Sequence, residues 1–152
     1  MKINTKYLGE VEIEKEKIIN FKKGLLGFET LKEYVILNIP NNEAFQCLQS
    51  IKDPKVVFII TNPFLFFKDY DIKIDDEELK KIKITNNKEL LLYSIVTIPK
   101  DIKKMTANLL APIVINIDKR IAKQIVLENT NYKTKHFIYN ETKEVNKNVS
   151  TK

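Results

Sequence analysis

Three features of this chain carry residue types capable of chemistry: an Asp-rich segment, a single histidine and a single cysteine. The segment 69–75 spaces Asp69, Asp71 and Asp75 at alternate positions, as in the oxygen-ligand pattern of a calcium loop. It lacks the central glycine, has Lys73 at a ligand position and has no glutamate at the twelfth position. We therefore interpret it as an exposed strand that leads into a helix, and we expect no metal site.

The histidine and the cysteine stand alone. His136 is the only histidine, and a general base needs a positioned partner that the sequence does not supply. Cys47 alternates with Phe45 in an apolar stretch, which favours a small buried side chain over a nucleophile. One thiol forms no internal disulfide and no thiolate cluster for zinc, and it favours a reducing, cytoplasmic setting. We expect no catalytic residues and no cofactor, so the protein is predicted not to be an enzyme.

The positive charge and one aromatic run raise the question of nucleic-acid binding. The net charge is +6, but Arg120 is the only arginine, and the lysines are scattered among acidic residues. A nucleic-acid interface concentrates basic residues on one face and interleaves them with stacking aromatics. The run Phe64–Phe67 has only Lys68 beside it, which favours a place in or near the core, with protein contact as the alternative for exposed rings. We expect no direct nucleic-acid binding, and we keep a small RNA-binding β-barrel as the alternative because the pI is about 9.2.

The elements that must position these residues are predicted to be short strands. Hydrophobic alternation between turn residues predicts strands at 3–7, 11–13, 18–21, 33–39, 44–50, 56–60, 89–98, 113–117 and 121–127. Residues 56–60 are apolar on both faces, so this strand is expected to be the most buried. Acids followed by lysines predict one short helix over 75–82. The pattern predicts a mainly all-β fold of about eight or nine short strands, as a barrel or a sandwich.

The length of 152 residues fits one domain, which we place at residues 1–138. Apolar content falls after residue 139, so 139–152 is predicted to be a polar, disordered tail. The longest apolar run, 56–67, is interrupted by Thr61-Asn62-Pro63 and falls short of the ~20 residues of a membrane helix. We therefore expect no membrane partner.

Two glycines three residues apart predict a compact loop after the strand at 18–21. Gly24 and Gly27 would supply positive φ angles. We expect this loop to carry Leu25, Leu26 and Phe28 inward, as residues that support the fold.

Five segments in order resemble the FliW family of flagellar assembly factors. They are Phe21-Lys-Lys-Gly-Leu-Leu-Gly-Phe28, Tyr34-Val-Ile-Leu37, Phe45-Gln-Cys-Leu-Gln-Ser-Ile-Lys-Asp-Pro54, Asn108-Leu-Leu-Ala-Pro-Ile-Val-Ile-Asn116 and Gln124-Ile-Val-Leu127 with Tyr132. The resemblance runs from near residue 1 to about residue 138. It implies a β-barrel-like domain without enzymatic activity.

The resemblance also implies two protein partners. Members of the family bind the translational regulator CsrA and antagonise its repression of flagellin mRNA. They also bind flagellin, and the two partners exclude one another. Such an exchange couples flagellin synthesis to export and requires only a binding surface, since complexes linked by mass action need no catalytic group.

Polar and turn residues inside the resembling segments are the predicted partner contacts. They are Gln49, Ser50, Asp53, Asn116 and Asp118. A structural role is the alternative for each: Asp53 can start a turn before Pro54, and Asn116 can pair with neighbouring backbone. The net charge of this chain is basic, so a mode of partner recognition that required an acidic surface would not fit it.

Overall fold

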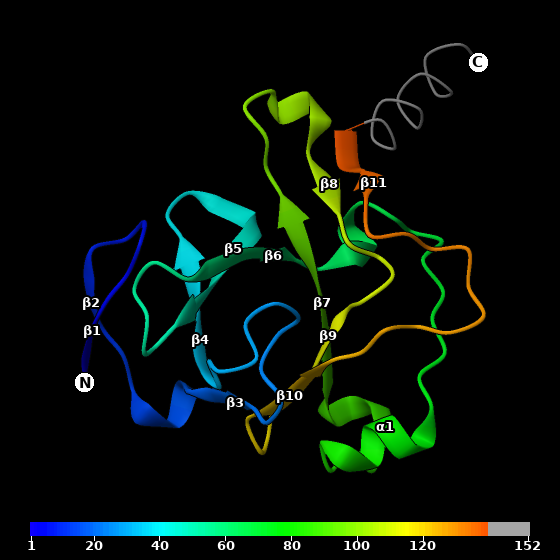
Figure 1. Cartoon of the computed structure of the whole chain (residues 1–152), viewed down its shortest axis with the longest axis horizontal. Coiled ribbons are helices and arrows are strands. Elements are labelled where there is room, and N and C mark those ends of the chain that lie inside the picture. Colours follow the sequence, from blue (N-terminus) through cyan, green and yellow to red (C-terminus); the bar gives the residue numbers. More distant parts are fainter. Residues whose placement is uncertain (140–152) are drawn as a thin grey trace.

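Seven strands close into a barrel in the computed structural model, which describes residues 1–139 (Figure 1). They are β3 (Ile19–Phe21), β4 (Glu33–Ile39), β5 (Asn42–Ser50), β6 (Val57–Thr61), β7 (Leu90–Thr97), β9 (Ile113–Asn116) and β10 (Ile121–Gln124). The hydrogen-bonded order is β7-β6-β5-β4-β3-β10-β9, and β9 pairs with β7 to complete the ring. Neighbours are antiparallel except β3 and β10, which are parallel. The prediction of a mainly β, barrel-like fold is confirmed.

Shorter elements surround the barrel. They are β1 (Lys2–Asn4), β2 (Glu10–Glu12), β8 (Thr106–Ala107), β11 (His136–Phe137), the helix α1 (Asp76–Lys81) and the 3-10 turns η1 (Lys15–Lys17), η2 (Pro63–Leu65), η3 (Asn87–Glu89) and η4 (Ile102–Lys104). β1 and β2 form a separate hairpin, while β8 and β11 extend the sheet from β7. Two-residue strands are too short to show alternation, which is why β8 and β11 were not predicted.

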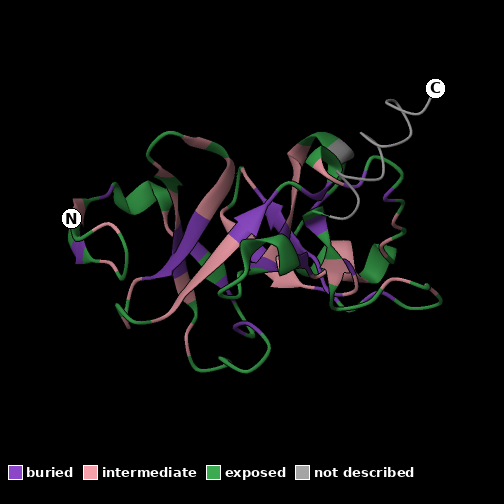
Figure 2. Ribbon diagram, turned by 90° about the horizontal axis from the view of Figure 1, so that it is seen from above, coloured by how far each residue is buried: buried purple, intermediate pink, exposed green. Residues whose placement is uncertain are grey.

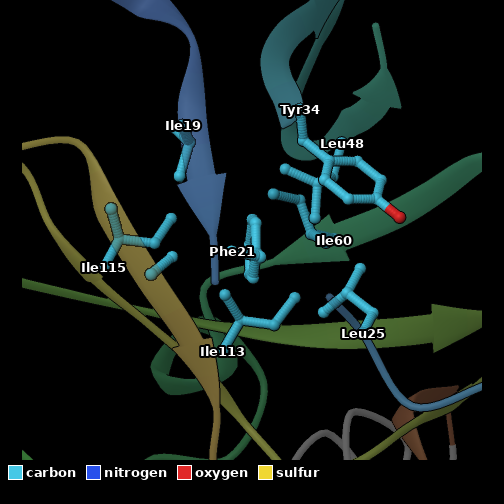
Figure 3. Close-up of a cluster of buried hydrophobic side chains, with 9 residues drawn as sticks. Ile19, Phe21, Leu25, Tyr34, Leu48, Ile60, Ile113 and Ile115 are labelled. Carbon is cyan, nitrogen blue, oxygen red and sulfur yellow. The ribbon is translucent and has the colours of Figure 1, made fainter. Parts of the chain in front are cut away.

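The barrel interior is a packed apolar core. The buried side chains in Figure 3 come from β3, β4, β5, β6, β9, β10 and the loop after β3. Phe21 and Tyr34 meet edge to face with ring centroids 5.3 Å apart. Fully burying one large apolar side chain contributes roughly 1.5–3 kcal/mol, so the shared core holds distant strands together. Buried residues concentrate in the strands, and exposed residues in the connections (Figure 2).

The most buried strand is β9, not the predicted 56–60. All four β9 residues are buried, whereas β6 is only half-buried from Val57 to Ile59. One face of β9 lines the barrel core through Ile113 and Ile115. Its other face is covered because Val114 packs in a second cluster with residues that follow α1. A strand is buried on both faces only where another element covers its outer face. The apolar residues at 56–60 could not show which strand the helix and the segment after it would cover.

Residues 140–152 lie outside the described part of the chain. The domain boundary at residue 138 and the polar tail at 139–152 thus remain predictions. Within residues 1–139, no helix is long and apolar enough to cross a membrane.

Candidate protein-interaction surface

Gln49 and Ser50 end β5 and are buried. The Gln49 amide nitrogen donates to the carbonyls of Ser50, Pro54 and Val56 at 3.1, 3.2 and 3.3 Å. Its amide oxygen accepts from the backbone N–H of Lys6 at 3.2 Å. Gln49 therefore joins the tip of the β1–β2 hairpin to the β5–β6 turn, and in this structure its side chain offers nothing to a partner.

Asp53 organises the β5–β6 turn. Its backbone N–H donates to the Ser50 hydroxyl at 3.1 Å, and its carboxylate accepts from the Lys55 N–H at 3.0 Å. Its carbonyl accepts from the N–H of Val56 at 3.1 Å. Asp53 is half-buried, so part of the residue remains open to solvent. It serves the turn before Pro54 and can still be reached by a partner.

Asn116 is the corresponding residue of the β9–β10 turn. It is fully buried, and its amide nitrogen donates to the carbonyls of Ile82 and Lys83 at 2.9 and 3.2 Å. Its amide oxygen accepts from the N–H groups of Asp118 and Lys119 at 3.1 and 3.2 Å. Asn116 thus fixes the turn to the chain leaving α1, while Asp118 itself is exposed.

The turns that follow β5 and β9 are together called the rim here. β5 and β9 run in opposite directions, so the two turns lie at opposite ends of the barrel, and a path of cross-strand pairs connects them. Ser50 lies opposite Tyr34, and Tyr34 lies opposite Ile19. The next residue of β3 lies opposite Ile121, which lies opposite Asn116. Three strands separate β5 from β9 along this path, so the turns are about 19 Å apart along the sheet. The five predicted contacts therefore form two separate groups, one at each turn, and their role in binding remains a prediction.

The loop after β3, residues 22–31 and called the glycine loop here, differs from its prediction. Leu25 is buried at 1% exposure, but Leu26 is 59% exposed and Phe28 is also at the surface. The loop is held firmly, because the Leu26 N–H donates to the Gln124 side chain at 3.0 Å and the Phe28 N–H to the Leu25 carbonyl at 2.8 Å. Val126, two residues beyond Gln124, is 52% exposed. Exposed apolar side chains on a loop that is held in place are candidate partner contacts. The prediction had placed Leu26 and Phe28 in the core because they are apolar.

The aromatic run after β6 is divided between core and surface. Phe67 is buried, and Phe66 stacks on Phe45 with centroids 5.7 Å apart. Phe64 and Leu65 in η2 are exposed. The run therefore forms the edge of the core and adds two apolar side chains to the surface.

The cysteine, the histidine and the Asp-rich segment do not form a catalytic or metal-binding arrangement in the part of the chain that the structure describes. Burial raises the pKa of the Cys47 thiol, which suits a buried apolar side chain. His136 Nε2 accepts from the Lys133 N–H at 2.8 Å. Within residues 1–139, no three His, Cys, Asp or Glu side chains gather as metal ligands would. Residues 69–75 form no strand, contrary to the expectation for this segment. The Asp71 N–H donates to the Tyr132 hydroxyl at 2.8 Å.

A cleft lies between the segment before α1 and the segment after β10. Its volume is about 530 Å³, with Lys73, Asp75 and Glu78 on one wall and 123–129 on the other. The Ile125 and Leu127 N–H groups donate away from it, to the carbonyls of Pro112 and Leu110. Concave surfaces of this size can receive part of a partner chain.

Family membership follows from comparison with known proteins. The sequence matches the family model described as FliW protein over residues 2–138. The chain belongs to the FliW family. A flagellar assembly factor FliW from Clostridium tetani is 43% identical over 141 residues, covering 93% of this chain and 97% of that protein. One from Geobacillus thermodenitrificans is also 43% identical over 141 residues, with the same shares covered.

A solved FliW structure shares the fold. The crystal structure of a flagellar assembly factor FliW matches with a TM-score of 0.87 and 42% identity, covering 91% of this chain and 97% of that chain. The predicted family is therefore confirmed. The chain is a flagellar assembly factor of a family that is not enzymatic.

Proposed function

We propose that this FliW chain acts in the cytoplasm as a partner-exchange regulator of flagellin synthesis. It binds CsrA and antagonises the repression of flagellin mRNA. It also binds flagellin, which displaces CsrA. Free flagellin thereby returns CsrA to its mRNA target, and export of flagellin frees the FliW chain again.

Membership of the FliW family over nearly the whole chain is the observation that carries this proposal. The described surface supports it, because fixed loops display Leu26, Phe28 and Val126 to solvent. Apolar side chains held in place lose little conformational entropy when a partner covers them. Two partners that compete for one protein are linked through mass action alone.

We assign the predicted rim residues two different roles in this function. Asp53 and Asp118 are accessible and are proposed as direct contacts. Gln49, Ser50 and Asn116 are buried, so we propose that they act by holding the two turns in the shape that a partner meets.

Calorimetric titration of the purified chain with CsrA of the same organism, followed by flagellin in competition, tests the proposal. We expect saturable binding of CsrA that flagellin reverses, with a negative heat-capacity change from buried apolar surface. Failure of the folded chain to bind either partner would refute the proposed exchange.

The alternative, direct RNA binding by a small β-barrel, is favoured only by the net charge of +6. It requires an affinity that falls steeply as salt rises, because bound phosphates release counterions. A gel-shift series with RNA from low to moderate salt distinguishes the two. Absence of any shift at low salt would remove this alternative.

A further inference from the structure

A second, smaller cleft of about 320 Å³ opens beside β10 and is bordered by four lysines. Lys22 and Lys23 follow the end of β3, where the chain turns sharply because the Gly24 N–H donates to the Phe21 carbonyl at 2.8 Å. Lys81 ends α1, and Lys123 lies in β10. Three elements far apart in sequence therefore bring cationic side chains around one opening.

The positive charge of this lysine cleft is only partly neutralised. Glu78 pairs with Lys81 at 3.1 Å and also with Lys123. Glu77 adds a weaker electrostatic interaction at Lys81. Within residues 1–139, Lys22 and Lys23 have no ion-pair partner, and both are exposed. The cleft thus keeps an excess of positive charge concentrated at Lys22 and Lys23.

The remaining lining of the lysine cleft is aliphatic. Ile82, Ile121 and Ala122 line it, and Ile82 and Ala122 are almost fully buried. Among the residues that the structure describes, no aromatic ring and no arginine contribute to the lining. Nucleic-acid grooves rely on aromatic stacking and on arginine forks, so an aliphatic floor with a lysine border fits a peptide better.

We propose that the lysine cleft receives an acidic peptide segment that carries an aliphatic side chain, supplied by the flagellin partner. This inference rests on the proposed function. The sign of the charge favours a segment that carries carboxylates, because a basic segment would be repelled by the lysine border. Carboxylates of the segment meet the lysines, and its aliphatic side chain packs on Ile121 and on the methylene stems of the lysines.

Charge reversal at Lys22 and Lys23 tests the proposal. The double variant Lys22→Glu with Lys23→Glu should bind flagellin at least about ten-fold more weakly, because each attraction becomes a repulsion. Its affinity for CsrA should not fall. The matched control is Lys103→Glu with Lys104→Glu in η4, two consecutive exposed lysines on the opposite side of the barrel from α1 (Figure 1). The control should bind both partners as the wild type does.

The possible outcomes separate this inference from the proposed function. If the wild type binds both partners and the Lys22 and Lys23 variant binds flagellin undiminished, the inference is overturned and the proposed function stands. Equal loss of CsrA binding, or loss of an RNA gel shift in the same variant, would also overturn it. Absence of flagellin binding by the wild type would overturn both. Should the double variant unfold, Lys22→Gln with Lys23→Gln must give an intermediate loss of flagellin affinity, and unchanged affinity overturns the inference.

Discussion

The rim and the glycine loop use residue types in opposite ways. At the rim, the polar side chains of Gln49 and Asn116 are buried and bind backbone groups. In the glycine loop, Leu26 is exposed although it is apolar. Hydrogen bonds hold both regions in place. The polar side chains of the rim bind backbone groups of the same chain, whereas the glycine loop exposes an apolar side chain to solvent. Residue type alone therefore does not tell which side chains a partner meets.

Replacement of Asn116 should produce the largest effect. Asn116→Ala removes four hydrogen bonds and leaves the Ile82 and Lys83 carbonyls without this donor. Because buried polar groups are left unpaired, we expect the free energy of unfolding to fall by about 3 kcal/mol. Urea denaturation measures this loss. The melting temperature should fall by roughly 10 °C.

The neighbouring Asp118→Ala is the matched control and should change stability by less than about 0.5 kcal/mol, because the side chain is exposed. If Asn116→Ala keeps the wild-type stability and loses only partner affinity, then Asn116 is a direct contact and the contrast between rim and loop fails.

The two glycines of the loop allow a second test. A Cβ at Gly24 would lie 2.7 Å from the Glu29 Cα and the Phe28 carbonyl oxygen, at a φ of +65°. At Gly27, with a φ of +86°, the Cβ would meet nothing within 4 Å. We expect Gly24→Ala to cost about 3 kcal/mol through strain and steric overlap, and Gly27→Ala about 1 kcal/mol through strain alone. Equal losses in thermal denaturation would mean that the close approach at Gly24 relaxes freely.

Two adjacent leucines allow the stability of the glycine loop and its role in partner binding to be tested separately. Leu25→Ala should reduce stability by about 3 kcal/mol because Leu25 is buried in the barrel core. Leu26→Ser should leave the unfolding midpoint nearly unchanged and weaken partner binding about ten-fold, or about 1.4 kcal/mol. Calorimetric titration of both variants measures the difference. Wild-type affinity in Leu26→Ser would show that the displayed leucine is not a contact.

Local sequence patterns predicted the strands well, because a strand is recognised from the alternation of neighbouring residues and from the turn residues that end it. β4 was predicted with its observed bounds because alternation over 33–39 ends at Pro40. The depth of Asn116 was not predictable in this way, since its partners Ile82 and Lys83 lie more than 30 residues away along the chain. Leu26 was misread for the same reason: its exposure follows from the path of the loop in three dimensions.

The smallest expected effect concerns the ion pair that joins α1 to the barrel wall beside the rim. The hydrogen bond from the Lys123 ammonium lowers the pKa of Glu78 below its ordinary value of 4.5, and Lys81 adds to this against a desolvation effect. A lowered folded-state pKa means that the pair stabilises the fold above the unfolded pKa and loses this contribution as pH falls through the folded one.

Glu78→Gln should therefore lower stability at pH 7 by less than about 1 kcal/mol, because solvent screens the partly exposed pair. The difference from wild type should shrink as the pH of urea titrations is lowered from 7 to below 4.5. A difference that stayed constant with pH would mean that Glu78 contributes by packing. Because Asn116 is uncharged, the loss in Asn116→Ala should persist at every pH where the wild type is folded. The two tethers of the same segment are thus distinguishable: a charged pair at the surface depends on pH, whereas a buried amide does not.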